Sequence, residues 1–328
     1  MTRATTNRTH LLRRLWEWMP REVTRPVIVL AWLSFALQIA LIGTGGAVRL
    51  TASGLGCPTW PNCSADSFVP TPELGIHGII EFTNRMLTFV LSVVVILMFL
   101  IVLRLRRNRP DIFRLALTQG LSIPFQAVLG GISVLSGLNP YVVGSHFLVS
   151  ILLVVLVTHL VYRAYDGRRG GPRNTPRWYV AIGVVNTVFI GITVVLGVLT
   201  TGAGPHAGDN SNAKALAPRN GLNPALLQEV HSIPAYITFG LTVLMVVIAL
   251  VARDRARWGR VRLWALGLFV VELAQIIVGI TQAKEGLPVG LVNIHLVLAG
   301  ILVAAITALL MSLRAGRKQE LAGTPTAS

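Results

Sequence analysis

Long uncharged stretches dominate the pattern of this chain. The 23 residues between Arg25 and Arg49 contain no Asp, Glu, Lys or Arg, and neither do the 48 residues between Arg114 and Arg163. A helix needs about 20 apolar residues to cross a hydrocarbon core about 30 Å thick. The longer stretch contains Gly137 and Pro140, which predict a turn between two helices. We therefore expect an all-α polytopic membrane protein with eight transmembrane helices, at 26–47, 78–103, 113–136, 142–162, 178–201, 227–252, 263–282 and 290–313.

The third and fourth predicted helices resemble the seventh and eighth. Gln126 precedes His146 by 20 residues, and Gln275 precedes His295 by the same spacing. Gly130 and Gly279 match within this frame. Four spans per repeat give both repeats the same orientation, related by an axis along the membrane normal. The expected architecture is two pseudo-repeated four-helix bundles.

This repeat defines the expected domains. An N-terminal half and a C-terminal half each contain four spans, and a basic, glycine-containing linker joins them. The expected divisions are a cytoplasmic segment 1–25, the N-terminal half 26–162, a cytoplasmic linker 163–177, the C-terminal half 178–313 and a cytoplasmic tail 314–328.

Composition and charge support a membrane location. Hydrophobic residues make up 53% of the chain and charged residues 13%, against roughly 25% charged residues in soluble domains, so a soluble globular fold is excluded. The net charge is +16, but 24 of the 29 basic residues lie in alternate segments between spans. This distribution is typical of loops facing anionic cytoplasmic lipid. We expect a multi-pass plasma-membrane protein with both termini cytoplasmic, a lipid environment and no nucleic-acid partner.

Three histidines occupy comparable positions near the outer ends of predicted helices. His231 and His295 belong to the same half, and His146 is the repeat equivalent of His295. Two imidazoles facing each other across a bundle can hold one haem iron axially. Ionisable groups within spans usually have a function, although hydrogen bonds to backbone carbonyls are an alternative role for these rings.

The first half has an acid where the second has a histidine pair. Asn84 stands where His231 predicts a partner, and His77, Glu81 and Asn84 share one helical face. Glu81 is a candidate proton donor or acceptor, or the partner of an arginine, Arg49 or Arg85.

Glu272 lies in the middle of the seventh span, where a helix–helix hydrogen bond and a proton path are both open interpretations.

The only two cysteines, Cys57 and Cys63, lie in the first outer loop. The outer face of a membrane permits disulfides, and a metal site needs more ligands than two thiols. We expect a disulfide, with a structural and a redox role both open.

Together these residues resemble a known family, the haem A synthases. The resemblance is carried by the segment Gly45-Gly46-Ala47-Val48-Arg49-Leu50-Thr51-Ala52-Ser53-Gly54-Leu55-Gly56-Cys57-Pro58 with Cys63 after it, by 81–85, and by His146, His231 and His295. It implies an enzyme that oxidises the methyl at ring position 8 of haem O to a formyl group through successive hydroxylations, giving haem A. It also implies a haem O synthase upstream and a terminal haem–copper oxidase downstream.

The resemblance also implies roles for individual residues. His231 and His295 are expected to hold a haem b cofactor toward the outer face, and His146 to bind the iron of the substrate haem. Glu81 is expected close to the reacting methyl. Arg49 and Arg85 are candidates for haem propionates or for lipid phosphate.

The sequence departs from the family pattern at one position. Many members have Glu-x-x-His-Arg in the second span, whereas this chain has Asn84 in place of the histidine. Asparagine is a poor iron ligand, so either His146 alone holds the substrate haem or His77 supplies the second bond. Two other classes of function are alternatives to the enzyme: a non-catalytic b-type haem electron carrier and a transporter.

Overall fold

The computed structural model describes residues 19–165, 175–206 and 218–313. The tail 314–328 lies outside them, as do most of the segment 1–25 and most of the linker 163–177. Eight helices of the described part are long and apolar enough to cross a membrane, which confirms the expected fold class. They are α2 (Arg25–Leu50), α3 (Gly75–Val102), α4 (Pro110–Leu135), α5 (Pro140–Tyr165), α6 (Arg177–Ala203), α7 (Pro224–Val251), α8 (Arg255–Lys284) and α9 (Val289–Ser312). Short 3₁₀ turns, η1 (Pro72–Leu74) and η2 (Leu103–Arg106), flank α3.

Prolines set the beginnings of several helices. Pro110, Pro140 and Pro224 are the first residues of α4, α5 and α7. The proline ring presets a helical φ, and its missing N–H has no partner to lose in the first turn. The Asn223 side chain also caps α7 by accepting hydrogen bonds from the next turn. These three helices therefore begin two or three residues before the apolar stretches from which they were predicted.

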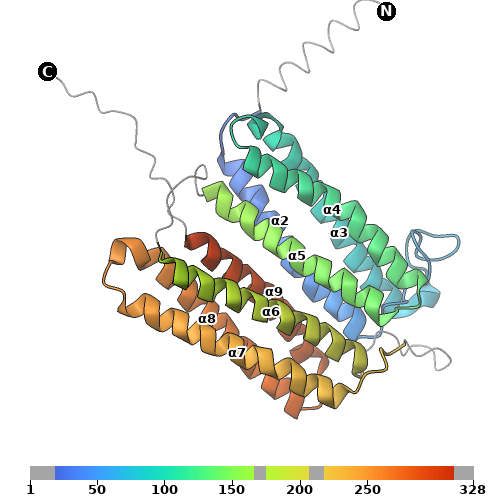
Figure 1. Cartoon of the computed structure of the whole chain (residues 1–328). Coiled ribbons are helices and arrows are strands. Elements are labelled where there is room, and N and C mark those ends of the chain that lie inside the picture. Colours follow the sequence, from blue (N-terminus) through green and yellow to red (C-terminus); the bar gives the residue numbers. More distant parts are fainter. Residues whose placement is uncertain (1–18, 166–174, 207–217, 314–328) are drawn as a thin grey trace, which may run out of the picture.

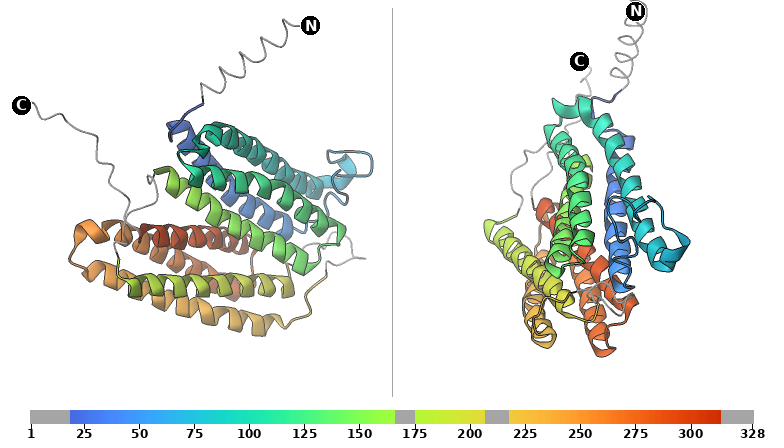
Figure 2. Two further views of the ribbon diagram at one scale, coloured as in Figure 1. Left: turned by 45° about the horizontal axis from the view of Figure 1, so that its top comes forward. Right: turned by 90° about the vertical axis from the view of Figure 1, so that its right-hand side faces the viewer.

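The helices form two adjacent groups of four. Helices α2 to α5 pack together, and so do α6 to α9. Figure 1 shows the two groups side by side, and the views in Figure 2 agree. Between the groups, α9 packs against α2 and α5, and α5 packs against α6. Helix α9 is the most buried of the eight, so it is the central element of the molecule.

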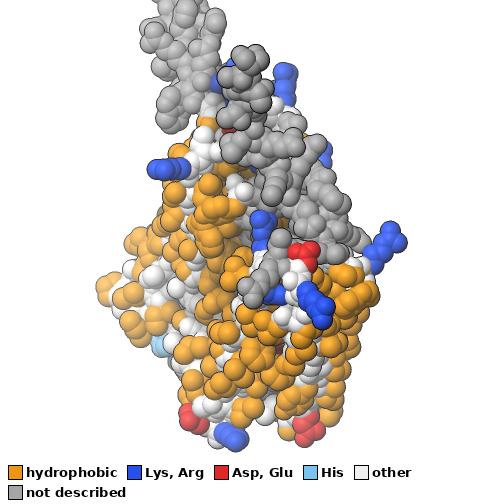
Figure 3. All heavy atoms as spheres, turned by 90° about the vertical axis from the view of Figure 1, so that its left-hand side faces the viewer, with side chains coloured by type: hydrophobic (Ala, Val, Ile, Leu, Met, Phe, Trp, Pro, Cys, Tyr) orange, Lys and Arg blue, Asp and Glu red, His pale blue; other side chains and the backbone are white. Residues whose placement is uncertain are grey.

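The outside of the bundles is apolar. Large hydrophobic side chains such as Phe89, Leu152 and Leu263 are more than 60% exposed, and hydrophobic side chains cover most of the face in Figure 3. An apolar surface of this extent is compatible with lipid and not with water. The interior instead contains buried polar residues, including Asn186, Thr242 and Glu272.

Candidate functional site

The loop between α2 and α3 is closed by a disulfide. Cys57 and Cys63 are bonded, with an S–S distance of 2.00 Å, and both side chains are fully buried, which confirms the expected pair. The loop presses closely on two helices. A side chain at Gly56 would collide with the backbone carbonyl of His77 on α3, and one at Gly131 of α4 would meet the Trp60 ring at 2.6 Å. The loop therefore covers the N-terminal end of α3 and the C-terminal end of α4.

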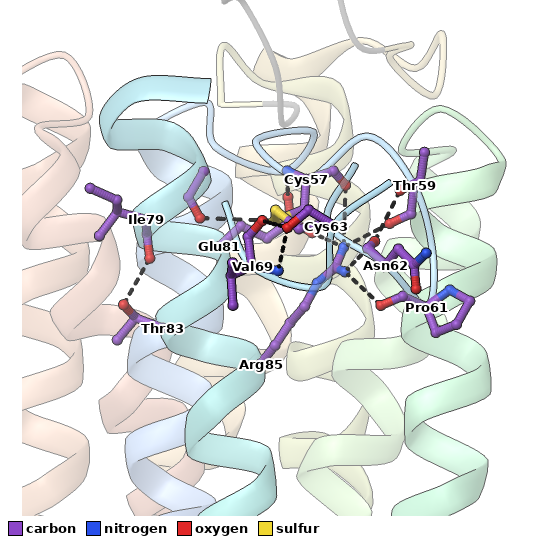
Figure 4. The surroundings of a disulfide bond; sticks show 12 residues. Cys57, Thr59, Pro61, Asn62, Cys63, Val69, Ile79, Glu81, Thr83 and Arg85 are labelled. Carbon is purple, nitrogen blue, oxygen red and sulfur yellow. Dashed lines mark hydrogen bonds and ion pairs between the residues drawn. A yellow bond between two sulfur atoms is a disulfide. The ribbon is translucent and has the colours of Figure 1, made fainter. Parts of the chain in front are cut away.

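Glu81 is buried directly beneath this loop. Its Oε2 accepts a hydrogen bond from the Cys57 backbone N–H at 2.6 Å, and its Oε1 forms an ion pair with Arg85 Nη2 at 2.5 Å. Figure 4 shows both side chains pointing toward the disulfide. Of the two partners expected for Glu81, Arg85 is the one in contact. The carboxylate is thus held by a charge and a backbone donor, both from its own half.

Arg85 organises the backbone of the loop. Its guanidinium donates to the carbonyl oxygens of Cys57 at 3.2 Å and Asn62 at 3.1 Å, and also to those of Thr59 and Pro61. Five N–H groups in a rigid fork suit arginine to several acceptors at once. This role was missed from the sequence, because the spacing between Arg85 and the loop carbonyls depends on how the loop folds back over α3.

The other polar residues of α3 have partners in α2 and the loop that follows it. His77 Nδ1 lies 2.8 Å from Ser53 Oγ. Asn84 Oδ1 accepts a hydrogen bond from Thr44 Oγ1 at 2.7 Å. Neither hydroxyl residue was predicted from the sequence, since nothing in their local pattern distinguishes them from other Ser and Thr in the chain.

His146 lies on α5 against a glycine of α4. A Cβ on Gly130 would come within 3.3 Å of His146 Cε1. Gln126 Nε2 donates to the His146 carbonyl at 3.3 Å and to Ser150 Oγ at 2.8 Å. Nδ1 of His146 is buried without a hydrogen-bond partner. This ring therefore packs closely against α4, and its Nδ1 has no hydrogen-bond partner.

The second half repeats this arrangement at His295. A Cβ on Gly279 of α8 would come within 3.1 Å of His295 Cε1. Gln275 Nε2 donates to the His295 carbonyl at 3.1 Å, and His295 Nδ1 is also buried without a partner. The matched Gln, Gly and His residues of the two halves thus make matched contacts.

His231 on α7 completes a pair with His295. A Cβ on Gly197 of α6 would come within 3.0 Å of His231 Cε1, and Nδ1 donates to the Thr193 carbonyl at 2.9 Å. His231 and His295 are close enough to interact electrostatically. A ligating imidazole typically donates its other N–H to a carbonyl, which fixes the ring. His231 has this arrangement, with Nε2 left for a metal.

Asn84 on α3 occupies a position equivalent to those of His146, His231 and His295, each of which faces a glycine on the preceding helix. A Cβ on Gly45 of α2 would lie 4.0 Å from Asn84 Oδ1. A glycine on the preceding helix therefore faces each of the four positions, three filled by histidine and one by asparagine. No cluster of three or more His, Cys, Asp or Glu suited to a bare metal ion occurs in the described residues. Paired axial histidines fit a haem instead, because the porphyrin supplies the remaining ligands.

Arg49, in the last turn of α2, connects the two halves. Its Nε donates to the His206 carbonyl at 3.0 Å, and His206 Nε2 in turn donates to the Leu287 carbonyl at 2.8 Å. Arg49 Nη2 is buried without a partner, so this guanidinium retains a donor for an anionic group. Within the described residues it forms no hydrogen bond or ion pair with Glu81.

Comparisons with known proteins agree with the resemblance seen in the sequence. A family model described as cytochrome oxidase assembly protein matches residues 28–307. A haem A synthase of Bacillus pumilus is 37% identical over 139 residues, 40% of this chain and 43% of that protein. A haem A synthase of Listeria welshimeri is 30% identical over 143 residues, 42% of this chain and 47% of that protein. The matched region thus spans less than half the length of each relative. Since the family model covers most of the chain, including the three histidines, Glu81 and both cysteines, this chain belongs to the family of cytochrome oxidase assembly proteins.

Proposed function

We propose that this membrane protein is a haem A synthase, which oxidises the methyl at ring position 8 of haem O to a formyl group by successive hydroxylations. The observation that carries the proposal is the set of histidine rings that pack closely against a glycine of the preceding helix. The second half has two, His231 and His295, and the first half has one, His146. A half with two ligands suits a resident haem b, and a half with one suits a haem that must react and leave.

In this proposal the second half holds haem b between His231 and His295. The resident haem supplies redox chemistry when bound. The chain contributes the orientation of the rings: the Thr193 carbonyl fixes His231, and Gln275 holds the backbone of His295. Close packing against Gly197 and Gly279 keeps each ring from turning.

The first half receives haem O, with His146 as its iron ligand. The Asn84 amide oxygen is engaged by Thr44, and His77 is bonded to Ser53 two helical turns nearer the outer surface. We therefore favour His146 as the one strong ligand. His77→Ala tests the two-ligand alternative, since it should mimic loss of His146 only if His77 binds the iron.

Glu81 is the proposed acid–base residue near the reacting methyl. Its Oε2 is held by the Cys57 N–H and its Oε1 by Arg85, so the carboxylate is fixed in place and shielded from bulk water by the loop. A positioned carboxylate can accept a proton and release it. An electron carrier needs no such group beside its haem, and for this reason we do not favour the carrier alternative.

The cellular setting follows from the proposed reaction. We place both termini in the cytoplasm and the haem sites toward the outer face of the plasma membrane, on the distribution of basic residues. A haem O synthase must supply the substrate, and a terminal haem–copper oxidase uses the product. Arg49 and Arg85 are proposed partners of the haem propionates, Arg49 through its unpaired Nη2.

The test uses membranes that make haem O but not haem A, with and without this protein, followed by chromatography of the extracted haems. The wild-type chain should produce haem A or its hydroxylated precursor. Glu81→Gln should retain haem b and lower product formation by about a hundredfold or more, the contribution of a positioned acid or base. Glu73→Gln, at an exposed acid before α3, is the matched control and should remain active.

Two results would contradict the proposal. Unchanged haem O beside newly bound haem b, in a host where a known synthase works, would indicate an electron carrier. Absence of any bound haem would remove the basis of the histidine assignment.

A further inference from the structure

The described part of the chain has two buried carboxylates, one in each half. Glu81 and Glu272 are 5% and 3% exposed. Glu81 has a charged partner, Arg85, and its place in the proposed reaction is given above. Among the described residues, Glu272, on α8, has no ion-pair partner, and neither of its carboxylate oxygens has a hydrogen-bond partner of regular geometry. A bare charge in a helix bundle is costly, so Glu272 requires a separate explanation.

Glu272 belongs to a buried polar cluster formed by three helices. Asn186 of α6 donates through Nδ2 to the Thr242 hydroxyl of α7 at 2.9 Å, and Thr242 is a polar neighbour of the Glu272 carboxylate. Thr238 lies one turn from Thr242 on α7, and its hydroxyl and Asn186 Oδ1 are buried without partners. Unpaired acceptors therefore predominate. A proton on Glu272 would turn one of these acceptors into a donor.

This cluster lies below the histidine pair, on the inner sides of the same helices. Glu272 precedes Gly279, the glycine that His295 touches, by seven residues. Thr238 follows His231 by seven residues. Seven residues make two helical turns on one face, a rise of about 10 Å. A carboxylate at this distance in a low-dielectric interior senses a change of one charge at the histidine pair.

At the repeat position of Glu272, only the half with two histidines has an acid. In the frame that matches His146 to His295, the counterpart of Glu272 is Ile123. In the frame that matches Gly45 to Gly197, the counterpart of Asn186 is Ser34, which is also fully buried. A role limited to helix–helix packing gives no reason for a carboxylate on this side alone.

No other charged group of the neighbouring helices contacts Glu272 in the described part. On α7 the titratable residues are Glu229, His231 and Tyr236, of which Glu229 and Tyr236 are exposed. On α9 the only such residue is His295. The Tyr179 hydroxyl of α6 is occupied by the Met245 carbonyl. The ionisable groups of α6, α7 and α9 that are not exposed are therefore the histidine pair and Tyr179.

We propose that Glu272, with Thr242 and Asn186, is a proton-binding site coupled to the oxidation state of the haem held by His231 and His295. Reduction of that haem by one electron from a small-molecule reductant adds one negative charge to the second half. One proton from water then binds the Glu272 carboxylate, and reoxidation releases it. This inference rests on the haem site of the proposed function.

The test is a spectroelectrochemical titration of the purified full-length protein with its bound b-type haem, with redox mediators, at a series of pH values. In the wild type the midpoint potential should fall over part of the range by up to about 59 mV per pH unit, the conversion for one proton per electron. Glu272→Gln should flatten this slope, and Glu272→Asp should restore at least half of it. Glu285→Gln, an exposed acid after α8, is the matched control and should retain the wild-type slope.

The outcomes separate this inference from the proposed function. A wild-type potential independent of pH, or a slope unchanged in Glu272→Gln, overturns the proton site while leaving the haem site intact. Full low-spin haem retained in both His231→Ala and His295→Ala overturns the haem site itself. If Glu272→Gln does not fold, Thr242→Val and Asn186→Leu replace it. The wild-type slope unaltered in both of these variants counts against the proposal.

Discussion

At the scale of single residues, the histidine sites depend on glycines in the facing helices. Gly197 lets the His231 ring approach α6 closely enough for Nδ1 to reach the Thr193 carbonyl. Gly279 has the same relation to His295. The ring position therefore depends on the absence of a side chain across the helix contact, as well as on the histidine.

This relation predicts the effect of filling Gly197. Gly197→Val places carbon atoms where the His231 ring lies, so the ring must move and the b-type haem should be lost or bound at least tenfold more weakly. Gly191→Val is the matched control, because nothing lies within 4 Å of the Cβ position on the same helix. The measurement is the haem-to-protein ratio of the purified variants by absorbance. Equal haem content in the two variants would show that close packing on Gly197 is unnecessary.

The sequence predicted these residues better than it predicted their contacts. The 20-residue spacing from Gln126 to His146 recurs at Gln275 and His295, and both glutamines bond the backbone of their histidine. The Thr193 carbonyl and the Thr44 hydroxyl could not be predicted, because they are brought into contact by the crossing of two helices far apart in sequence. The roles of Glu81 and the three histidines in the reaction remain predictions.

At the scale of elements, the loop between α2 and α3 is held by one arginine. Arg85 donates to several loop carbonyls and to Glu81. The buried disulfide is accessible to a reductant only when this loop opens. The strength of the Arg85 contacts therefore sets how readily Cys57 and Cys63 are reduced.

Arg85→Lys should speed reduction of the disulfide. Lysine keeps the positive charge beside Glu81 but cannot reach the loop carbonyls with a planar fork. Losing a single charged hydrogen bond worth about 1.5 kcal/mol raises the opened fraction about tenfold. The rate is followed by maleimide labelling during treatment with a mild reductant. Arg219→Lys, at an exposed arginine between α6 and α7, is the control. Equal rates in both variants would contradict this role of Arg85.

The boundaries of the helices were less predictable than their number. All eight predicted spans are present, because about 20 uncharged residues in a row have few alternatives to a membrane helix. Helix α8 nevertheless begins at Arg255 rather than at residue 263. Charged residues at a membrane surface can continue a helix into water, so the end of an apolar stretch does not mark the end of the helix.

At the scale of the whole molecule, the two halves meet through glycines on α2 and α9. A Cβ on Gly43 would lie 3.1 Å from Val297, and one on Gly46 would collide with the Asn293 side chain. On the opposing helix, a Cβ on Gly300 would lie 3.0 Å from Ile42. Small residues let membrane helices approach closely where no hydrophobic effect drives them together. The sequence predicted two halves but not this contact, since the glycines show no spacing that identifies their partner helix.

Because Gly300 lies in this close contact between α9 and α2, a substitution there tests directly how the two halves are held together. Gly300→Leu forces a branched side chain against Ile39 and Ile42 of α2. Overpacking of this kind costs about 1–3 kcal/mol, so the variant should unfold or aggregate at a lower temperature in detergent. Gly290→Leu, on the same helix with open space at its Cβ position, should behave as the wild type. Thermal unfolding followed by size-exclusion chromatography measures both. Since the proposed haem b ligands lie within the second half and Glu81 within the first, moderate separation of the halves should leave haem b bound while lowering haem A formation. Unchanged stability of Gly300→Leu would mean that α2 and α9 can move apart without cost, and that the halves are held together elsewhere.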